Sequence, residues 1–204
     1  VTAAKLFALM SGEIAIDSPA GPSEVFIIAD KTANPKFIAA DLMCDAEHGK
    51  DSAAILITTS KKLAKQVIEE IKESITQFST KDRIKESIKQ YGLFATVNSI
   101  DEAVIFANDY ATEHIQIITA QASKVAKKIN NAGSVFIGNY TCKSAGDYAT
   151  GANHVLPTGG SAKMFAGLSV LDFIRPMEYQ KCTKQGLKKI KNTIETFAEI
   201  EKLP

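Results

Sequence analysis

The sequence predicts an α/β fold: a doubly wound, mostly parallel sheet with flanking helices, followed by a helical C-terminal tail. Short apolar runs rich in Val and Ile, typical of strands that are buried on both faces, recur along the chain. Helix-length amphipathic stretches separate them, and this alternation is typical of parallel sheets with crossover helices. The chain has 204 residues, of which 45% are hydrophobic, so it is long enough to bury a core.

The expected strands and helices follow from apolar spacing. The first helix has clear end signals, with Asn34 as a plausible N-cap, Pro35 at the first helical position and Gly49 just past the end. The expected strands are Val25–Ala29, Ala53–Thr58, Leu93–Val97, His114–Thr119 and Ser134–Gly138. The expected helices between them are Pro35–His48, Lys61–Phe78, Ile100–Ala111 and Ala122–Asn131.

Two segments depart from the alternation. Residues 139–160 form a long stretch rich in Gly, Ser, Thr and Asn, which predicts a loop, and loops of this length in compact domains are usually functional or disordered. A helical tail is expected from about Ser169. We interpret its lysines as a solvated face rather than an anion site: Lys181, Lys184, Lys188, Lys189 and Lys191.

Composition excludes several classes of protein. The formal net charge of +1 argues against a nucleic-acid binder or a protein of anionic membranes. Three widely spaced cysteines form neither a disulfide framework nor a metal knuckle, as expected in a reducing cytoplasm. No apolar run approaches the ~20 residues of a membrane helix, and no signal peptide is expected. The chain begins at Val1 without a methionine, which suggests a fragment or a processed product.

The first expected helix carries a polar face. Asp41, Cys44, Asp45 and His48 fall at i, i+3, i+4 and i+7, so they share one side of the helix. An aspartate and a histidine three residues apart can both reach one cation, and Zn²⁺ accepts both ligand types. An exposed acidic helix end explains the same pattern better when the helix is taken alone.

Two other polar groups are candidates for chemistry. Glu113 and His114 stand at the junction before a strand, where a carboxylate and an imidazole could act as base and acid; ordinary surface polarity is an equal alternative. The segment Ser144–Thr158 places Asp147 and His154 among glycines, which suits a loop that presents polar groups to a ligand. A capped structural turn is the competing interpretation. These groups suggest a metal or catalytic cleft without naming the reaction.

Several motifs together resemble one family. DSPAGPSEV (17–25), DAEHGKDSAAILIT (45–58), YATEHIQI (110–117), NAGSVFIG (131–138) and SAGDYATGANHVLPT (144–158) look like histidinol dehydrogenase, in that family's order and spacing. The likeness covers essentially all 204 residues. GLSVLDF (167–173) also resembles this family more than its relatives that act on other alcohols.

The resemblance implies an activity. Histidinol dehydrogenases oxidise L-histidinol through the aldehyde to L-histidine, the last step of histidine biosynthesis, with two NAD in succession. One zinc ion per site holds the substrate through its amino and imidazole nitrogens. The implied protein is a cytoplasmic homodimer with a shared active site, and it has no nucleic-acid or membrane partner.

The resemblance also implies residue roles. Glu113 would activate the water that hydrates the aldehyde, and His114 would be the base in the hydride-transfer steps. His48 and Asp147 would be zinc ligands; Asp45 stands where the family usually has glutamine, and is the third metal candidate. His154 is expected only to line the cleft. The residues expected to contact substrate are Ser23, Asp45, His48, His114, Asp147 and Glu201, the last from the tail of the neighbouring subunit.

The resemblance divides the chain into three parts. Residues 1–21 would be the end of a truncated cofactor-binding domain, 22–165 the α/β catalytic domain, and 166–204 a helical tail for dimer contact. No cofactor-binding residue is expected in this segment. The chain also stops just short of a tail histidine that the family supplies to the partner's zinc, so the chain alone is expected to be an inactive partial enzyme.

Two alternatives remain from the sequence. One is a related zinc and NAD dehydrogenase of another alcohol, such as a sulfonated diol. The other is a non-catalytic α/β binding module that has kept the scaffold, against which the intact Glu113–His114 pair argues.

Overall fold

The computed structural model describes residues 1–203, which fall into two compact units, Val1–Asp172 and a second unit from Phe173 onward. Helices and strands follow one another as predicted for an α/β chain. Every helix among the described residues is too short or too polar to cross a membrane.

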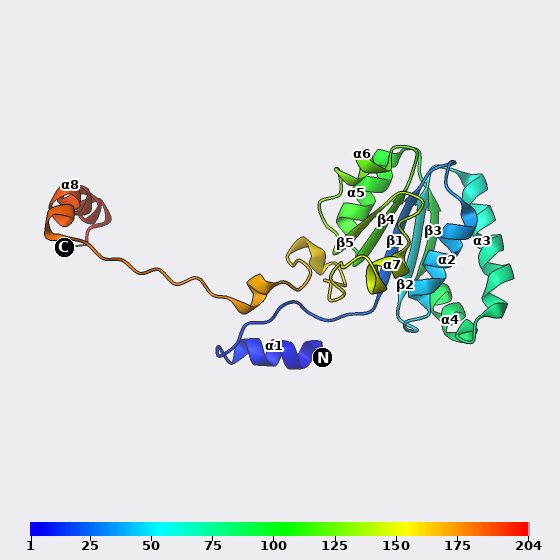
Figure 1. Ribbon diagram of the computed structural model, residues 1–204, viewed down its shortest axis with the longest axis horizontal. Helices are drawn as coiled ribbons and strands as arrows, with labels where there is room; N and C mark the ends of the chain where they lie inside the picture. The colour runs from blue at the N-terminus through cyan, green and yellow to red at the C-terminus, as the bar shows by residue number, and fades with distance from the viewer. Residues whose placement is uncertain (204) are drawn as a thin grey trace. The chain divides into compact units, whose positions relative to one another are not determined.

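The first unit is built around a sheet of five strands (Figure 1). The strand order is β3-β2-β1-β4-β5, and each neighbouring pair is parallel. The five predicted strands are all confirmed, and none of their ends is shifted by more than one residue. Their bounds are β1 Glu24–Ala29, β2 Ala53–Thr58, β3 Gly92–Thr96, β4 His114–Ile118 and β5 Ser134–Ile137.

Helices cover both faces of this sheet, which confirms the doubly wound class (Figure 1). Successive side chains of a strand point to opposite faces. Accordingly, Val25 and Ile27 of β1 pack in one core with helices α2 (Pro35–Ala46), α3 (Lys61–Ser74) and α4 (Lys81–Tyr91). Phe26 and Ile28 pack in a second core with α5 (Ile100–Tyr110) and α6 (Ala122–Ala126).

The end signals of α2 act as predicted. The Asn34 side chain accepts a hydrogen bond from the backbone N–H of Lys36 at 2.9 Å, and Pro35 begins the helix. The helix ends at Ala46 rather than His48. This cap fixes the start of α2 beside the carboxyl end of β1, so the helix runs back toward the start of that strand.

Several predicted boundaries are wrong. Two helices were not predicted: α1 (Thr2–Met10) and α4, which has Ile84 and Ile88 at helical spacing but buries little of its surface. Helix α6 ends at Ala126, short of the predicted Asn131. The predicted loop 139–160 contains a short helix, α7 (Lys143–Tyr148). Single 3₁₀ turns lie at Ile75–Gln77, Ser161–Lys163 and Val170–Phe173.

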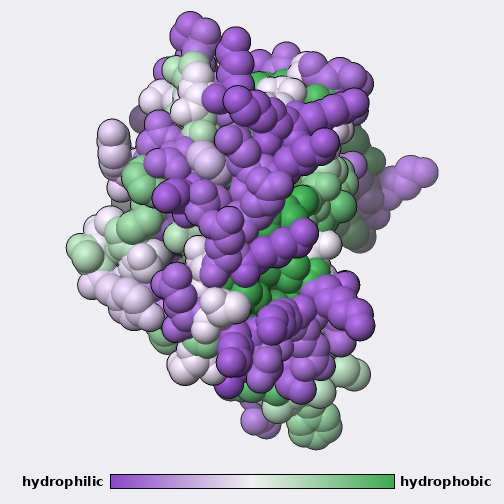
Figure 2. Space-filling model, turned by 90° about the vertical axis from the view of Figure 1, so that its right-hand side faces the viewer, coloured by the Kyte–Doolittle hydropathy of each residue, from purple (hydrophilic) through white to green (hydrophobic). Residues whose placement is uncertain are grey.

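The outer surfaces of α3 and α4 are polar, because both helices turn their apolar residues to the sheet. Figure 2 shows that hydrophilic side chains dominate one side of the molecule, with hydrophobic side chains visible in a hollow between them. A pocket of about 390 Å³ between α3 and α4 is lined by Ile71, Ile75 and Ile88.

The second unit contains one helix, α8 (Lys184–Glu201), among its described residues. The predicted helical tail is therefore confirmed, but its regular helix begins later than Ser169. The Thr183 side chain caps it by accepting from the backbone N–H of Gly186 at 3.0 Å. Apolar residues at helical spacing are exposed along it: Leu187, Ile190, Ile194, Phe197 and Ile200.

Candidate functional site

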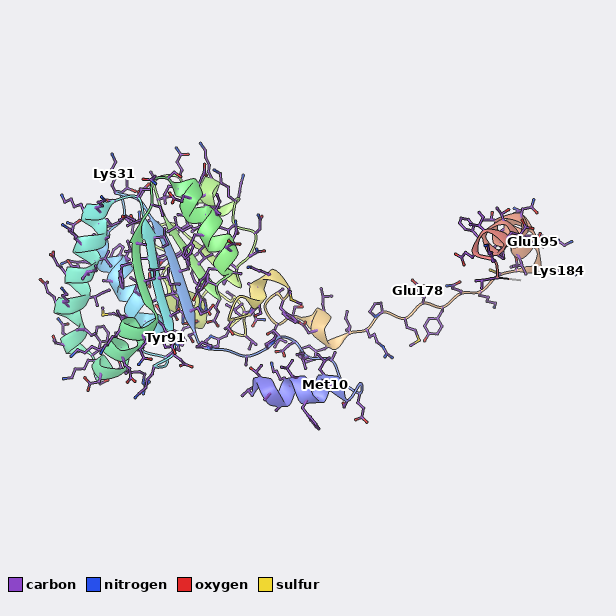
Figure 3. All side chains as sticks on the ribbon, turned by 180° about the vertical axis from the view of Figure 1, so that it is seen from behind. Met10, Lys31, Tyr91, Glu178, Lys184 and Glu195 are labelled. Atoms are coloured by element: carbon purple, nitrogen blue, oxygen red, sulfur yellow. The ribbon has the colours of Figure 1, made fainter. Side chains whose placement is uncertain are left out.

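The predicted site residues of the first unit gather at the amino ends of the strands. Glu24 opens β1, His114 opens β4, and α2 ends beside them. Figure 3 shows the two ends of the sheet, with Lys31 beyond the carboxyl end of β1 and Tyr91 at the opposite end, just before β3. In doubly wound sheets ligands usually bind at the carboxyl ends of the strands. This cluster lies at the other end.

His114 is held from several sides. Its Nδ1 lies 3.2 Å from the backbone carbonyl of Glu24, 3.5 Å from Oε2 of Glu113 and 3.6 Å from Oδ2 of Asp45. The residue is 5% exposed. An Nδ1–H that donates to the Glu24 carbonyl would fix the tautomer with Nε2 as the basic nitrogen. The alternative of ordinary surface polarity for Glu113 and His114 is wrong, because both are buried.

Glu113 and Glu24 face each other across β1 and β4. The backbone N–H of Glu24 donates to Oε2 of Glu113 at 3.1 Å, and Oε1 of Glu24 accepts from the backbone N–H of Gly159 at 3.1 Å. Burial raises the pKa of Glu24 and raises the pKa of Glu113 from 4.5 to about 7. A carboxyl group that titrates near neutrality can take a proton from water at physiological pH.

Asp45 connects α2 to this pair. Its side chain is fully buried, and burial opposes its charge, yet the neighbouring His114 imidazole and the charge of Lys143 lower its pKa. The same carboxylate raises the pKa of His114, which burial alone would lower. The alternative of an exposed acidic helix end is therefore wrong for Asp45, and also for Asp41, which is 6% exposed.

Helix α7 brings Asp147 to the cluster. The helix packs closely on β5, because a Cβ on Gly146 would lie 2.5 Å from the ring of Phe136. Its first residue, Lys143, is buried and places Nζ 2.7 Å from Oδ1 of Asp45 and 2.8 Å from Oδ2 of Asp147. Burial opposes the ammonium charge, but the Asp45 and Asp147 carboxylates raise the pKa of Lys143.

The remaining predicted residues are less closely connected. The imidazole of His48 is exposed, with Nδ1 2.9 Å from the carbonyl of Cys44 and 3.8 Å from Oδ1 of Asp45. His154 is exposed and lies 3.5 Å from Oδ1 of Asp147. Ser23 is half-buried beside β1, and its carbonyl accepts from the backbone N–H of Ala53. Glu201 ends α8 in the second unit, so its role at the site stays a prediction.

The three predicted zinc ligands do not form a metal centre in this arrangement. Within residues 1–203 no three acidic, cysteine or histidine side chains converge closely enough to hold a metal ion. The carboxylates of Asp45 and Asp147 instead converge on the Lys143 ammonium. Zinc needs its ligand oxygens at about 2.0–2.2 Å, which would put the ion where Nζ lies.

The carboxyl end of the sheet does not fit a dinucleotide in the usual way. Dinucleotide-binding folds carry a glycine-rich turn after the first strand, so that the backbone can approach the pyrophosphate. The turn from β1 to α2 here runs Asp30-Lys31-Thr32-Ala33-Asn34, without glycine. The sequence-based expectation that this segment holds no cofactor-binding residues stays a prediction.

Sequence reasoning missed two charged residues of the cluster. Lys143 stands four residues before Asp147, a spacing that joins side chains on a helix, but the composition of this segment predicts a loop. Glu24 is a single charged residue at the start of an apolar strand, inside the GPSEV motif. Its contacts with Glu113, 89 positions away, have no local signal.

Comparisons with known proteins give consistent matches. The family model for histidinol dehydrogenase matches residues 1–204. Histidinol dehydrogenase of Lactococcus lactis is 48% identical, in a match that covers 94% of this chain and 44% of that enzyme's length. Histidinol dehydrogenase of Methanothermobacter thermautotrophicus is 46% identical, in a match that covers 100% of this chain and 47% of that enzyme's length. The chain thus spans about half the length of these relatives.

Solved structures agree. The crystal structure of histidinol dehydrogenase from Elizabethkingia anophelis is 46% identical, with a TM-score of 0.92 over 100% of this chain and 46% of that one. A propionaldehyde dehydrogenase from Clostridium phytofermentans has a TM-score of 0.50 at 15% identity over 82% of this chain and 51% of its own, a likeness of fold alone.

Proposed function

The chain belongs to the histidinol dehydrogenase family, and we propose that the protein carrying it oxidises L-histidinol through the aldehyde to L-histidine with two NAD. This would be the last step of histidine biosynthesis and would take place in the cytoplasm. The observation that supports the proposal best is the buried Glu113–His114 pair, held between Glu24 and Asp45 at the start of β4.

We assign the alcohol proton to His114. Oxidation of an alcohol removes a hydride from carbon and a proton from oxygen, so a base must stand beside the hydroxyl. Nδ1 of His114 faces the Glu24 carbonyl, the Glu113 carboxylate and Asp45. Nε2 is therefore the nitrogen we assign to accept the substrate proton. Neighbouring Asp45 would stabilise the imidazolium that forms, without itself being protonated.

We assign the water of the second step to Glu113. An aldehyde can lose a further hydride only after water has added to its carbonyl carbon to give the hydrate. Glu113 would take one proton from that water as the new C–O bond forms. Its pKa, raised by burial to about 7, matches a base that works near neutrality. The alcohol oxidation would then release one hydride and one proton. The aldehyde oxidation would release one hydride and two protons, one from the added water to Glu113 and one from the acid, which leaves as its carboxylate.

NAD would supply the hydride acceptor in both steps. The turn after β1 has no glycine, so we place the NAD-binding residues outside the α/β domain of residues 22–165. Residues 1–21 would join that cofactor domain. We further propose a homodimer in which Glu201 reaches the partner's substrate and Ser23 contacts the substrate from its own subunit.

The proton transfers assigned to His114 and Glu113 are not routed through zinc. Asp45, His48 and Asp147 remain the family's expected ligand positions, but two of them pair with an ammonium group. The His114 imidazole and the Glu113 carboxylate account for the proton transfers that we assign.

The test is turnover by the full-length protein. L-histidinol and NAD should give two NADH per substrate and L-histidine as the product, measured by absorbance and chromatography. A sulfonated diol and simple alcohols serve as competing substrates. If one of them is oxidised and histidinol is not, the substrate is wrong; if none is oxidised by correctly folded protein, the catalytic proposal fails. Lys128→Met, beside Asp101 at the carboxyl end of the sheet, is a matched variant that should retain turnover.

A further inference from the structure

A buried ammonium group stands at the centre of the candidate metal site. The side chain of Lys143 is 2% exposed, and those of Asp45 and Asp147 are 0% and 4% exposed. Nζ lies 2.7 Å from one carboxylate and 2.8 Å from the other. Lysines are almost never fully buried unless they are paired, and here one cation is shared by two anions.

The chain holds this lysine in place by its backbone as well. The Lys143 N–H donates to Oδ1 of Asp41 at 3.2 Å, and Oδ2 of Asp41 accepts from Nε2 of Gln116 in β4 at 2.7 Å. Gly146, one turn further along, packs on Phe136 of β5. Helix α7 is thus attached to both α2 and the sheet, and Nζ is directed inward by a fixed backbone.

A divalent ion and this ammonium exclude each other. A metal bound to both carboxylates would need their oxygens at about 2.0–2.2 Å, within the volume that Nζ occupies. The two cations would also repel strongly at that distance. The Lys143 ammonium already gives the two carboxylates a cationic partner, with one charge instead of the two of a divalent metal, and removing one partner of a buried ion pair is costly.

We infer that Lys143 is the resident cation of this site, and that a divalent metal binds Asp45 and Asp147 only by displacing the Lys143 side chain. The inference concerns the same site as the proposed function but does not depend on its reaction. Lys143 acts as a positioning residue: it neutralises Asp147 and orients Asp45, whose other oxygen faces His114. Metal affinity should therefore be limited by the lysine rather than by the number of ligands.

The experiment measures zinc binding to the full-length protein after dialysis against a chelator, without substrate or NAD. Zinc dissociation constants are obtained by calorimetry or by competition with a chromophoric chelator. Lys143→Met keeps the length of the side chain and removes its charge, and it should bind zinc at least about tenfold more tightly than wild type because a like charge is gone. Lys143→Arg keeps the positive charge, so its zinc affinity should not exceed that of wild type.

Two controls make the comparison specific. Lys128→Met removes an exposed lysine paired with Asp101, far from the cluster, and should leave zinc affinity unchanged. The double variant Lys143→Met/Asp45→Asn should lack the increase in zinc affinity expected for Lys143→Met, because one of the two carboxylates is removed. Zinc affinity of Lys143→Met equal to or weaker than that of wild type would overturn the inference. Failure of the proposed function would instead appear as absent turnover, whatever the zinc affinities.

A second measurement needs no variant and covers the case in which Lys143→Met does not fold. Acylation of lysines followed by mass spectrometry should find Lys143 protected in the metal-free wild type. Zinc at concentrations that load the site should make Lys143 reactive, since its side chain must leave. Zinc loading with Lys143 still protected would contradict displacement.

Discussion

Glu24 and Glu113 each accept a hydrogen bond from the backbone N–H of the other, at 3.1 and 3.2 Å; Glu24 is the first residue of β1, and Glu113 directly precedes β4, its parallel neighbour. This reciprocal pairing fixes two buried carboxyl groups beside His114. It lies directly before the first paired residues of the two strands, Val25 and His114. The orientation of the proposed base therefore depends on strand pairing as well as on the Glu113–His114 sequence.

Glu113→Gln in the full-length protein should slow aldehyde oxidation much more than alcohol oxidation, since only the aldehyde needs an activated water. Loss of a general base typically costs about 10²–10⁴-fold. The two half-reactions are measured separately, starting from L-histidinol and from the aldehyde. Equal and slight losses in both would contradict the assignment.

His114→Asn should slow both oxidations, because each releases a proton from oxygen as hydride leaves. The expected loss is again about 10²–10⁴-fold in kcat, with a smaller change in KM. His154→Asn is a suitable comparison, as this exposed histidine reaches only Asp147 in the cluster. A His114→Asn enzyme with normal alcohol oxidation would show that another group is the base.

The pH dependence of stability should contain a contribution from Glu113. Burial raises its pKa from 4.5 to about 7, so the folded protein holds this proton more tightly than the unfolded chain. The stabilisation is full below pH 4.5 and is lost as pH rises through about 7. Relative to Glu113→Gln, wild type should lose up to about 3 kcal/mol of unfolding free energy across that window.

Urea denaturation at a series of pH values measures this difference. Glu69→Gln, on the exposed side of α3, is the matched control and should parallel wild type. Parallel curves for Glu113→Gln and wild type would mean that Glu113 does not titrate in this range.

A shared active site can be tested by mixing two inactive variants. If Glu201 of one subunit serves the site that contains Glu113 of the other, Glu113→Gln and Glu201→Ala homodimers should each be impaired. Hybrid dimers made by dissociating and reassociating the two should recover activity, because one of their two sites is then intact. If mass spectrometry detects hybrid dimers but their activity does not recover, the shared site is wrong. Glu113 and Glu201 would then serve a site within the same subunit, or Glu201 would lie outside the active site.

The 204-residue chain by itself should fold but not oxidise histidinol. Two apolar cores cover both faces of its sheet, which supports cooperative unfolding. Its first βα turn has no glycine, and the chain spans about half the length of its relatives. The checks are thermal unfolding followed by circular dichroism and NADH formation from histidinol. Steady NADH formation would show that the cofactor site lies within this chain.

The fold class was predictable from local pattern, because strands such as β1 and β2 are buried on both faces and appear as unbroken apolar runs. Helix α2 was equally clear, since Asn34 and Pro35 mark its start whatever surrounds it. Glu113 and His114 are neighbours in the sequence, so they were recognisable as a pair. Asp41 and Asp45 are four residues apart, so helical spacing places them on the same side of α2. These features depend on residues within one or two turns of each other, so the sequence by itself determines them.

Tertiary structure alone decided the rest. The strand order puts β4 beside β1 and so brings Glu113 to Glu24, and the packing of α7 on β5 and α2 brings Lys143 to Asp45. Neither contact has a spacing in the sequence that could predict it, because crossover connections join residues whose separation along the chain is arbitrary. Burial then changed the chemistry. The Asp45 carboxylate, which would be solvated on an isolated α2, shares the Lys143 ammonium with Asp147 of α7 in the folded protein, because an unpaired charge in the interior is too costly to keep.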